Sequence, residues 1–372
     1  MVDISVIVPT RERSHHLERC LTSLCHQRGV TDGYEIIVSA DDGETETAEV
    51  VEQLSRDAPV SLHLVTHQGT EFCPAANRNR GVLQSSGRYL VFCDGDCVVP
   101  PGHLATHQRR RRPGLSLVGA PTYLDRMTTE SLTVAGLERQ LRSLKTPLLP
   151  VIRAHFQQMI RHPSLPKLSG GFFSVWRRDF ELINGFDQRF VGWGCEDDDL
   201  RLRLRRSGVH IQSIQPHTKS YHLWHPPHAS RTKHWRDGPN VAYLQRGLRL
   251  TRCVEGLTQR TAADLQIASI AVNDRPEVAR QLFDNLDAGT SKEAEIEILS
   301  VPGSGTFSDR ADCRVVVVLE GGAVPRIPRV HLVFSDPPGP DRRRCFPLTD
   351  LEQLPDLVFQ ADSQYWDPVS IT

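Results

Sequence analysis

The chain has 372 residues, of which 39% are hydrophobic and 24% charged, and its formal net charge is -1. These values are typical of a folded globular protein and exclude a disordered chain, and the length predicts two domains. A charge this close to zero excludes a general attraction to nucleic acid. The four arginines at residues 109–112 could form a local basic patch, but we interpret them as a solvated surface turn ending at Pro113.

The N-terminal residues run directly into a β-branched segment, without the basic leader and apolar core of a signal peptide. No apolar stretch approaches the roughly 20 residues that span a bilayer. The nine cysteines are scattered and odd in number, as in proteins with reduced thiols. We therefore expect a cytoplasmic protein without membrane insertion.

The first hundred residues alternate between strand-like and helix-like segments. Strands are predicted at residues 4–10, 34–40, 61–67 and 88–94, and helices at 17–27, 45–56 and 75–84. This alternation predicts βαβ units and a doubly wound α/β sheet. Ligands of such sheets bind at the carboxyl ends of the strands, so the residues that follow each strand are the first candidates for a site.

A helix is predicted at residues 135–144, and the strand-helix pattern starts again near Thr261. Further strands are predicted at 265–272, 294–301, 313–320 and 329–336, and a helix at 275–286. We therefore predict a first domain over 1–257. A second, smaller α/β domain over 258–372 has no catalytic motif.

Two carboxylates follow the strand at residues 88–94, because Asp94 and Asp96 flank Gly95. Side chains two residues apart in an extended chain face the same side, and a glycine between them lets a bulky anion approach the backbone. Converging carboxylates suit a divalent cation that neutralises a diphosphate. The alternative is a plain surface turn, since Asp-Gly and Gly-Asp are common turn dipeptides. The neighbouring Cys93 and Cys97 are predicted to be small buried side chains.

The segment GWGCEDDDL, residues 192–200, places glycines on both sides of Trp193. Such a segment can act as a hinge that folds a large aromatic ring over a ligand. Four consecutive acids, Glu196 to Asp199, repel one another unless some of them pair with basic residues or serve in binding or catalysis. Asp199 precedes Arg203 by four residues, which predicts an ion pair in the first turn of a helix.

Three histidines, at positions 222, 225 and 228, are spaced by three in the segment SYHLWHPPH. Such a series could form a zinc site, although the sequence identifies no further ligands.

The segments ISVIVPTRERSHHLERCLTSLCHQ, YEIIVSADDGETETA and AANRNRGVLQSSGRYLVFCDGD resemble, in order and spacing, the nucleotide-diphospho-sugar transferase (GT-A) fold of family-2 glycosyltransferases. The later GGFFSVWRRDFELINGFDQRFVGWGCEDDDLRLRL is similar to the acceptor block of β-1,4-galactosyltransferases and chondroitin-type polymerases. The resemblance covers roughly residues 3–230. It implies an inverting enzyme that moves a hexose or N-acetylhexosamine from a UDP-sugar to a hydroxyl group of a glycan, peptide or small metabolite. It also implies a donor half of about 1–100 and an acceptor half of about 165–230 in the first domain. We expect the second domain to serve acceptor recognition or oligomerisation.

On the donor side, the resemblance implies that Pro9, Thr10 and Arg11 line the uridine pocket. Asp41 would accept a hydrogen bond from the uracil imide, with Asp42 as the alternative. Arg78 would contact the nucleotide or its diphosphate, and otherwise would be a solvent-facing helix arginine. For the loop after the strand at 88–94, the resemblance implies that Asp94 holds the ribose or the metal, that Gly95 lies at the donor and that Asp96 binds the metal directly.

On the acceptor side, the resemblance implies a lid at Trp193, acceptor binding by Glu196 and a general base at Asp197. It also implies a late histidine at the metal, which His222 fits best, with His225 in reserve. A mixed shell of aspartate and histidine suits Mn²⁺ better than Mg²⁺, which remains possible.

Two other functions are compatible with parts of the sequence. A haloacid-dehalogenase-like phosphatase would use Asp94 as a nucleophile, but its motif belongs on the first strand of a domain and it leaves residues 192–200 unexplained. A non-catalytic module that binds a sugar or nucleotide would have no need to keep Asp94, Asp96 and Asp197 together.

Overall fold

A computed structural model describes residues 2–41, 45–68, 72–144, 152, 156, 166–169, 171–226, 235–269, 294–301, 307, 310–318, 330–336 and 345–363. The chain divides into two compact units. The first comprises Met1–Asn240 with Glu255–Leu257, and the second Val241–Val254 with Thr258–Thr372. Among the described helices, none has the length and apolar character needed to cross a membrane.

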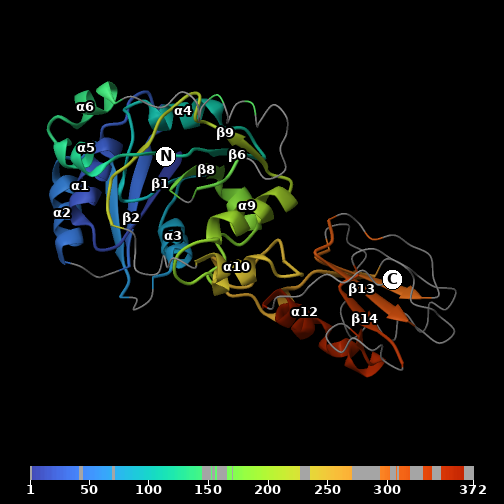
Figure 1. Ribbon diagram of the computed structural model, residues 1–372. Helices are drawn as coiled ribbons and strands as arrows, with labels where there is room; N and C mark the ends of the chain where they lie inside the picture. Colours follow the sequence, from blue (N-terminus) through green and yellow to red (C-terminus); the bar gives the residue numbers. More distant parts are fainter. Residues whose placement is uncertain are drawn as a thin grey trace. The chain divides into compact units, whose positions relative to one another are not determined.

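The first unit is built on a mixed seven-stranded sheet in the order β3-β2-β1-β4-β8-β6-β9 (Figure 1). The strands are β1 (Ile4–Thr10), β2 (Tyr34–Ala40), β3 (Ser61–Thr66), β4 (Tyr89–Cys93), β6 (Leu115–Val118), β8 (Phe172–Trp176) and β9 (His210–Ser213). The first four run parallel, whereas β8 is antiparallel to both of its neighbours. The predicted doubly wound α/β sheet is confirmed.

A small three-stranded sheet lies beside the cavity described below. Its strands are β5 (Cys97–Val98), β7 (Thr122–Tyr123) and β10 (Tyr221–His222). The central β10 is antiparallel to β5 and parallel to β7, and it aligns His222 with Cys97 and Tyr123. This pairing brings residues from three distant parts of the chain together.

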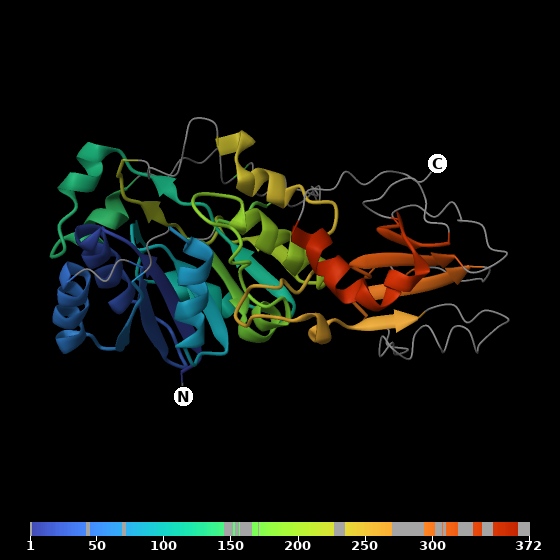
Figure 2. The ribbon, with the colours of Figure 1, turned by 90° about the horizontal axis from the view of Figure 1, so that it is seen from below.

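Helices cover both faces of the large sheet (Figure 2). The helices of the first unit are α1 (Ser14–Cys25), α2 (Thr45–Asp57), α3 (Pro74–Leu83), α4 (His103–Arg110), α5 (Arg126–Ser131), α6 (Leu137–Ser143), α8 (Arg177–Leu182) and α9 (Glu196–Arg206), with the 3-10 turn η1 (Trp235–Asp237). A further helix, α10 (Pro239–Leu244), begins at the end of the first unit and continues into the second. Because both faces are covered, every residue of β1 and β2 is buried, which explains their continuous β-branched character.

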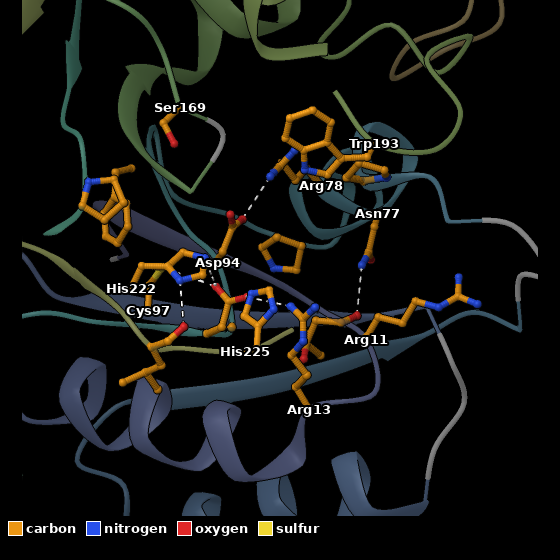
Figure 3. A pocket seen from close by; sticks show the side chains of 18 of the residues that line it. Arg11, Arg13, Asn77, Arg78, Asp94, Cys97, Ser169, Trp193, His222 and His225 are labelled. Carbon is orange, nitrogen blue, oxygen red and sulfur yellow. Dashed lines mark hydrogen bonds and ion pairs between the residues drawn. The ribbon is translucent and has the colours of Figure 1, made fainter. Parts of the chain in front are cut away.

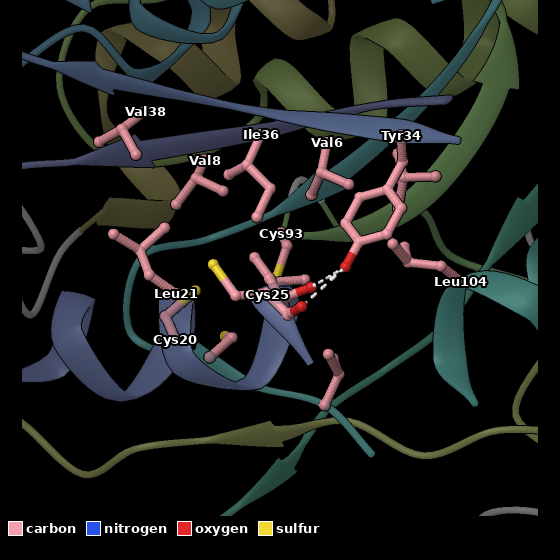
Figure 4. Packing of buried hydrophobic residues seen from close by; sticks show 14 of the residues in the cluster. Val6, Val8, Cys20, Leu21, Cys25, Tyr34, Ile36, Val38, Cys93 and Leu104 are labelled. Atoms are coloured by element: carbon pink, nitrogen blue, oxygen red, sulfur yellow. Dashed lines mark hydrogen bonds between the residues drawn. The ribbon is translucent and has the colours of Figure 1, made fainter. Parts of the chain in front are cut away.

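Each face of the sheet has its own apolar core. On one face, Leu17, Leu21 and Leu24 of α1 pack against Val6 and Val8 of β1 (Figure 4). On the other, a group of phenylalanines packs with apolar residues of α3, α8 and α9; these are Phe92, Phe173, Phe180 and Phe186. Phe92 and Phe173 stack face to face with ring centroids 4.3 Å apart, and this contact joins β4 to β8.

One carboxylate, that of Glu35, ties the first two strands to the start of β4. It is buried in β2 and accepts hydrogen bonds from Ser5 Oγ at 2.6 Å, from Ser86 N at 2.6 Å and from Gly87 N at 3.3 Å. A Cβ atom at Gly87 would lie 2.6 Å from Ser5 N, so only glycine allows this approach. Glu35 thus provides the hydrogen-bond acceptor for the backbone N–H groups of Ser86 and Gly87, just before β4 begins.

The four-arginine segment is not uniformly solvated. Arg109 and Arg110 end α4, whereas Arg111 pairs with the buried Asp3 at 2.5 Å. The Arg111 guanidinium also lies 5.1 Å from the ring centroid of Trp176. The prediction of a solvated turn is therefore wrong for Arg111. Its guanidinium has the Asp3 carboxylate as ion-pair partner and lies over the rings of Tyr89 and Trp176.

The second unit contains a parallel five-stranded sheet in the order β11-β12-β13-β14-β15. Its elements are η2 (Ala262–Asp264), β11 (Ile267–Ser269), β12 (Ile296–Val301), β13 (Cys313–Val318), β14 (Leu332–Phe334), β15 (Cys345–Phe346), η3 (Leu348–Gln353) and α12 (Leu354–Ser363). Strands occur at all four predicted places, and the helix predicted at 275–286 lies outside the described residues.

Residues 241–254 belong to the second unit, whereas the sequence had placed everything up to 257 in the first domain. Leu248, Leu250 and Val254 are buried in the core of the second unit. In addition, Arg246 forms a fully buried ion pair with Asp362, and the Nε–Oδ1 distance is 3.2 Å. These apolar contacts and this buried ion pair hold residues 241–254 in the second unit. A pattern of strands and helices in the sequence does not reveal such contacts.

Replacement of Glu35 by glutamine is expected to lower the free energy of unfolding by about 1–2 kcal/mol near neutral pH, because charge-assisted hydrogen bonds become neutral ones. Burial would raise the pKa of Glu35, but the hydrogen bonds from Ser5, Ser86 and Gly87 hold it below its ordinary value of 4.5. The stabilisation is therefore complete above the pKa of the unfolded carboxyl group. It disappears as the pH falls through the lower folded value.

Urea denaturation of wild type and Glu35→Gln from about pH 7 down to pH 3 measures this difference. The matched control is Glu52→Gln on α2, whose side chain is 69% exposed. A difference between wild type and Glu35→Gln that stays constant over the whole pH range would contradict the explanation.

Candidate active site

A cavity of about 640 Å³ opens at the carboxyl ends of β1 and β4 (Figure 3). The sequence-predicted residues that line it are Pro9, Thr10, Arg11, Arg78, Asp94, Gly95, Asp96, Trp193, Glu196, Asp197, His222 and His225. These residues come from three separate parts of the chain, yet they surround a single space. The predicted donor and acceptor halves therefore meet at one cavity.

The uracil candidate Asp41 is not among the residues that line this cavity. It is buried at the end of β2 and forms an ion pair with Arg80 of α3. Burial raises the pKa of Asp41, and the nearby positive charges of Arg80 and Arg11 offset part of that rise. The alternative residue Asp42 lies outside the described residues, as does His228.

Arg78 lies at the centre of an ion-pair cluster on one side of the cavity. Its guanidinium is 3.0 Å from Asp94 Oδ1, 3.2 Å from Glu196 Oε1 and 3.9 Å from Asp197 Oδ1. Its side chain is only 6% exposed, so the alternative of a solvent-facing helix arginine is wrong. Burial alone would lower the pKa of Arg78, but the three carboxylates raise it above its ordinary value. The guanidinium is therefore fixed as a cation.

Asp96 lies in a second cluster on the other side, with His222 and His225. The Nε2 atom of His222 is 3.5 Å from Asp96 Oδ1, and that of His225 is 3.1 Å from Oδ2. Burial would raise the pKa of Asp96, but the hydrogen bond from His225 and the neighbouring His222 and Arg13 hold it below its ordinary value. The Asp96 carboxyl group is therefore fixed as an anion.

The donor atoms of this second cluster fit a divalent transition-metal ion. One ligand atom each from Asp96, Cys97 and His222 lie within 4.8 Å of one another. His225 adds a second imidazole, whose ring centroid is 5.1 Å from that of His222. Carboxylate with imidazole is a combination that Mn²⁺ accepts more readily than Mg²⁺ does. Both candidate histidines therefore reach the same carboxylate.

The glycines on both sides of Trp193 have a backbone conformation that residues other than glycine rarely adopt. Gly192 and Gly194 have φ values of 80° and 100°, in the left-handed region. Asn240 holds this segment, because its side-chain amide donates to the carbonyl oxygens of Val191 and Gly194 at 3.0 Å each. The half-buried Trp193 side chain lines the cavity.

The acidic run after Trp193 divides between structure and cavity. It forms the first turn of α9, and Asp199 pairs with Arg203 at 2.6 Å in a fully buried position. This confirms the predicted i,i+4 ion pair. Glu196 and Asp197 instead line the cavity.

Two glycines allow the close packing behind the carboxylates. A Cβ atom at Gly95 would lie 3.0 Å from Thr10 Oγ1, so the glycine lets the loop after β4 pack against the end of β1. A Cβ atom at Gly171, just before β8, would lie 2.4 Å from Asp94 Oδ2. From the sequence we expected Gly95 to let an anion approach the backbone, and no pattern pointed to Gly171.

The sequence did not single out several residues that line the cavity. These are Arg13, Phe72, Pro74, Asn77, Pro121, Tyr123, Leu124, Ser169, Phe172, Leu223 and Trp224. Cys97, which was predicted to be a small buried side chain, is buried and also lines the cavity. Arg13 follows β1 by three residues, so the rule about strand ends could have found it. Tyr123 packs on His222, with ring centroids 4.8 Å apart, through the pairing of β7 with β10. No local pattern predicts that pairing.

Replacement of Asp199 by alanine is expected to lower the free energy of unfolding by about 3–5 kcal/mol, because the buried Arg203 cation loses its carboxylate partner. Asp198→Ala is the matched control, since the Asp198 side chain is 37% exposed and pairs with Arg201 at 3.3 Å. The control should cost less than about 1 kcal/mol. Chemical denaturation measures both values, and equal losses would contradict the division of the acidic run.

Comparison with known families identifies two regions of the chain. Residues 5–168 match the model of glycosyl transferase family 2, and residues 152–226 match that of the N-terminal domain of galactosyltransferase. Together with the mixed seven-stranded sheet, these matches confirm the predicted GT-A fold. They cover the part of the chain that forms the cavity.

The chain is also similar to individual proteins. It is 28% identical to GalNAc(5)-diNAcBac-PP-undecaprenol beta-1,3-glucosyltransferase of Campylobacter jejuni, over 52% of this chain and 57% of that protein. It is 25% identical to chondroitin synthase of Escherichia coli, over 62% of this chain and 36% of that protein. The chain thus spans between about a third and three fifths of these relatives' lengths.

Among solved structures, the mannosyltransferase PcManGT of Pyrobaculum calidifontis, in complex with GDP-Man and Mn²⁺, is 17% identical with a TM-score of 0.45. That match covers 64% of this chain and 61% of the other. The two family matches, over residues 5–168 and 152–226, agree with the resemblance found in the sequence.

Proposed function

We propose that this chain is an inverting, metal-dependent glycosyltransferase that moves a hexose or N-acetylhexosamine from a UDP-sugar to a hydroxyl group. The observation that carries the proposal is the single cavity, which unites strand-end residues 9–11, the Asp94 and Asp96 carboxylates and the acids at the start of α9. The family 2 match and the names of the two curated relatives support sugar transfer. A glycan, a peptide or a small metabolite would serve as the acceptor.

The donor would lie against the carboxyl ends of β1 and β4. Pro9, Thr10 and Arg11 would contact the uridine, and Asp94 the ribose. Asp96 and His222, with His225, would hold a divalent cation, preferably Mn²⁺, that offsets the charge of the departing UDP. Arg78 is already neutralised by its own carboxylates, so its contribution would be to orient Asp94 toward the donor.

The acceptor would lie against the start of α9. Trp193 would cover the sugar, Glu196 would bind the acceptor, and Asp197 would remove the proton from the attacking hydroxyl group. The positive end of the α9 dipole favours an ionised carboxylate at this place, which a general base requires. Inversion in one step needs such a base on the face of the sugar opposite the leaving UDP.

The two alternative functions receive no comparable support. A phosphatase of the haloacid-dehalogenase type would carry its motif after the first strand, whereas Asp94-Gly95-Asp96 follows β4. The same motif lines one cavity with Trp193 and Asp197, which favours a catalytic site over a simple binding module. For the second unit we propose a part in acceptor recognition or self-association, because its described residues form a separate sheet and core.

Removal of divalent cations is expected to abolish the hydrolysis of UDP-sugars and to weaken UDP binding. A panel of UDP-sugars, assayed for donor hydrolysis without an acceptor, should show recovery that is best with Mn²⁺. Asp96→Ala should remove the response to Mn²⁺ while the unfolding temperature stays close to that of wild type. Full activity in excess EDTA would refute the role of the metal.

Replacement of Asp197 by asparagine is expected to lower kcat by about 10²–10⁴, the usual contribution of a general base. Calorimetric titrations should find UDP and Mn²⁺ binding nearly unchanged. Glu196→Gln is the comparison variant and should act mainly on the KM of the acceptor. If NMR of the product showed that the donor's anomeric configuration is retained, the assignment of Asp197 would fail, because retention uses no such base.

A further inference from the structure

The two carboxylates after β4 each pair with an arginine, but the two arginines are held very differently. Arg78 contacts three carboxylates and is almost fully buried. Arg13 pairs with Asp96, with an Nη1–Oδ2 distance of 2.7 Å, and its side chain is 28% exposed. Arg78 is therefore fixed by its surroundings, whereas Arg13 has solvent beside it into which it can turn.

Four side chains surround the carboxylate of Asp96. Arg13 donates to Oδ2 at 2.7 Å, and His225 Nε2 lies 3.1 Å from the same oxygen. Oδ1 lies 3.4 Å from Cys97 Sγ and 3.5 Å from His222 Nε2. A cation that binds Oδ2 must therefore compete with the Arg13 guanidinium.

Arg13 is the one of these four side chains that cannot become a metal ligand. Imidazole nitrogens and thiol sulfur can turn a lone pair to a cation, but a guanidinium has no acceptor atom and keeps its positive charge. A cation at Asp96 would also lie close to that charge. Entry of the metal therefore requires Arg13 to leave Oδ2, while His222 and His225 can remain.

The backbone of Arg13 is anchored, so this departure needs only a change of side-chain conformation. The carbonyl oxygen of Arg13 accepts hydrogen bonds from the backbone N–H groups of His16 and Leu17, both at 3.0 Å. These bonds fix Arg13 at the start of α1. Its side chain lines the cavity where a diphosphate would lie in the proposed function.

We propose that Arg13 is an exchangeable counter-ion of Asp96, and this rests on the proposed function. Without a divalent cation, Arg13 neutralises Asp96. When a cation takes Asp96, the guanidinium turns to the oxygens of the donor diphosphate, for which its planar fork is well suited. The enzyme thereby binds the cation weakly until a nucleoside diphosphate gives Arg13 a new partner, so the two ligands bind with positive coupling.

Titration of the protein with Mn²⁺ in the absence of nucleotide, followed by electron paramagnetic resonance of free Mn²⁺, tests the first half. Arg13→Gln should bind Mn²⁺ about tenfold more tightly than wild type, because the competing cation is gone. Calorimetric titration with UDP at saturating Mn²⁺ tests the second half. There the same variant should bind UDP about tenfold more weakly, since a phosphate contact is lost.

Two further variants make the result specific. Arg13→Lys keeps the charge and should move both dissociation constants back toward wild type. Arg28→Gln removes an exposed arginine that pairs with Glu138 at 2.9 Å, far from the cavity lining, and should change neither constant. Opposite shifts of the Mn²⁺ and UDP constants are not expected from a general loss of stability.

Two results would overturn the role of Arg13 alone. One is an Arg13→Gln variant with both constants unchanged. The other is weaker Mn²⁺ binding by that variant, which would mean that Arg13 orients Asp96 for the metal. If wild type bound UDP equally well with and without Mn²⁺, the metal part of the proposed function would fail together with this inference.

Discussion

The buried charge of Arg78 is the constraint on which the cavity depends. A guanidinium that is almost removed from water must be matched by carboxylates, and here they come from the loop after β4 and from the first turn of α9. These segments are about a hundred residues apart in the chain. Since the unmatched charge would cost several kcal/mol, both segments are held at the same place. The ion pairs thus set the distance between the two sides of the cavity.

The cavity also lies where the sheet changes direction. β4 is parallel to β1, and β8 is antiparallel to β4, with Cys93 opposite Phe172. The end of one strand and the start of the next therefore meet at the same edge. Asp94 follows β4. Gly171 precedes β8 and, because it has no side chain, leaves room for the Asp94 carboxylate. The change of direction positions the site more directly than either strand does by itself.

The sequence predicted those parts of the molecule that depend on local patterns. The β-branched strands, the parallel order of the first βαβ units and the ion pair of Asp199 with Arg203 all follow from residues near one another in the chain. The pairing of β10 with β5 and β7 does not, although it brings His222 to Asp96. Resemblance to a known family supplied that histidine, with His225 in reserve, and the geometry then added Tyr123 and Arg13.

The roles of Asp41 and Arg111 show where local patterns stop. Asp41 follows β2 as a ligand-binding residue would, yet in the structure its partner is Arg80 and it does not line the cavity. Arg111 lies in a charged run that is typical of a surface turn, yet it stacks on Trp176. Both partners belong to other elements of the fold. A charged residue in a sequence therefore indicates a need for a partner without identifying it.

The chain passes between its two units three times, because residues 241–254 belong to the second, 255–257 return to the first, and the rest belongs to the second. Gly256 and Leu257 are bound to the first unit through the Gln188 side chain and the Asn184 carbonyl oxygen. During synthesis the first unit can be completed only after residue 257 has left the ribosome. Residues 241–254, with their buried leucines, have by then emerged without their own sheet. The order of synthesis therefore leaves Leu248, Leu250 and Val254 without their apolar partners until the second sheet has formed.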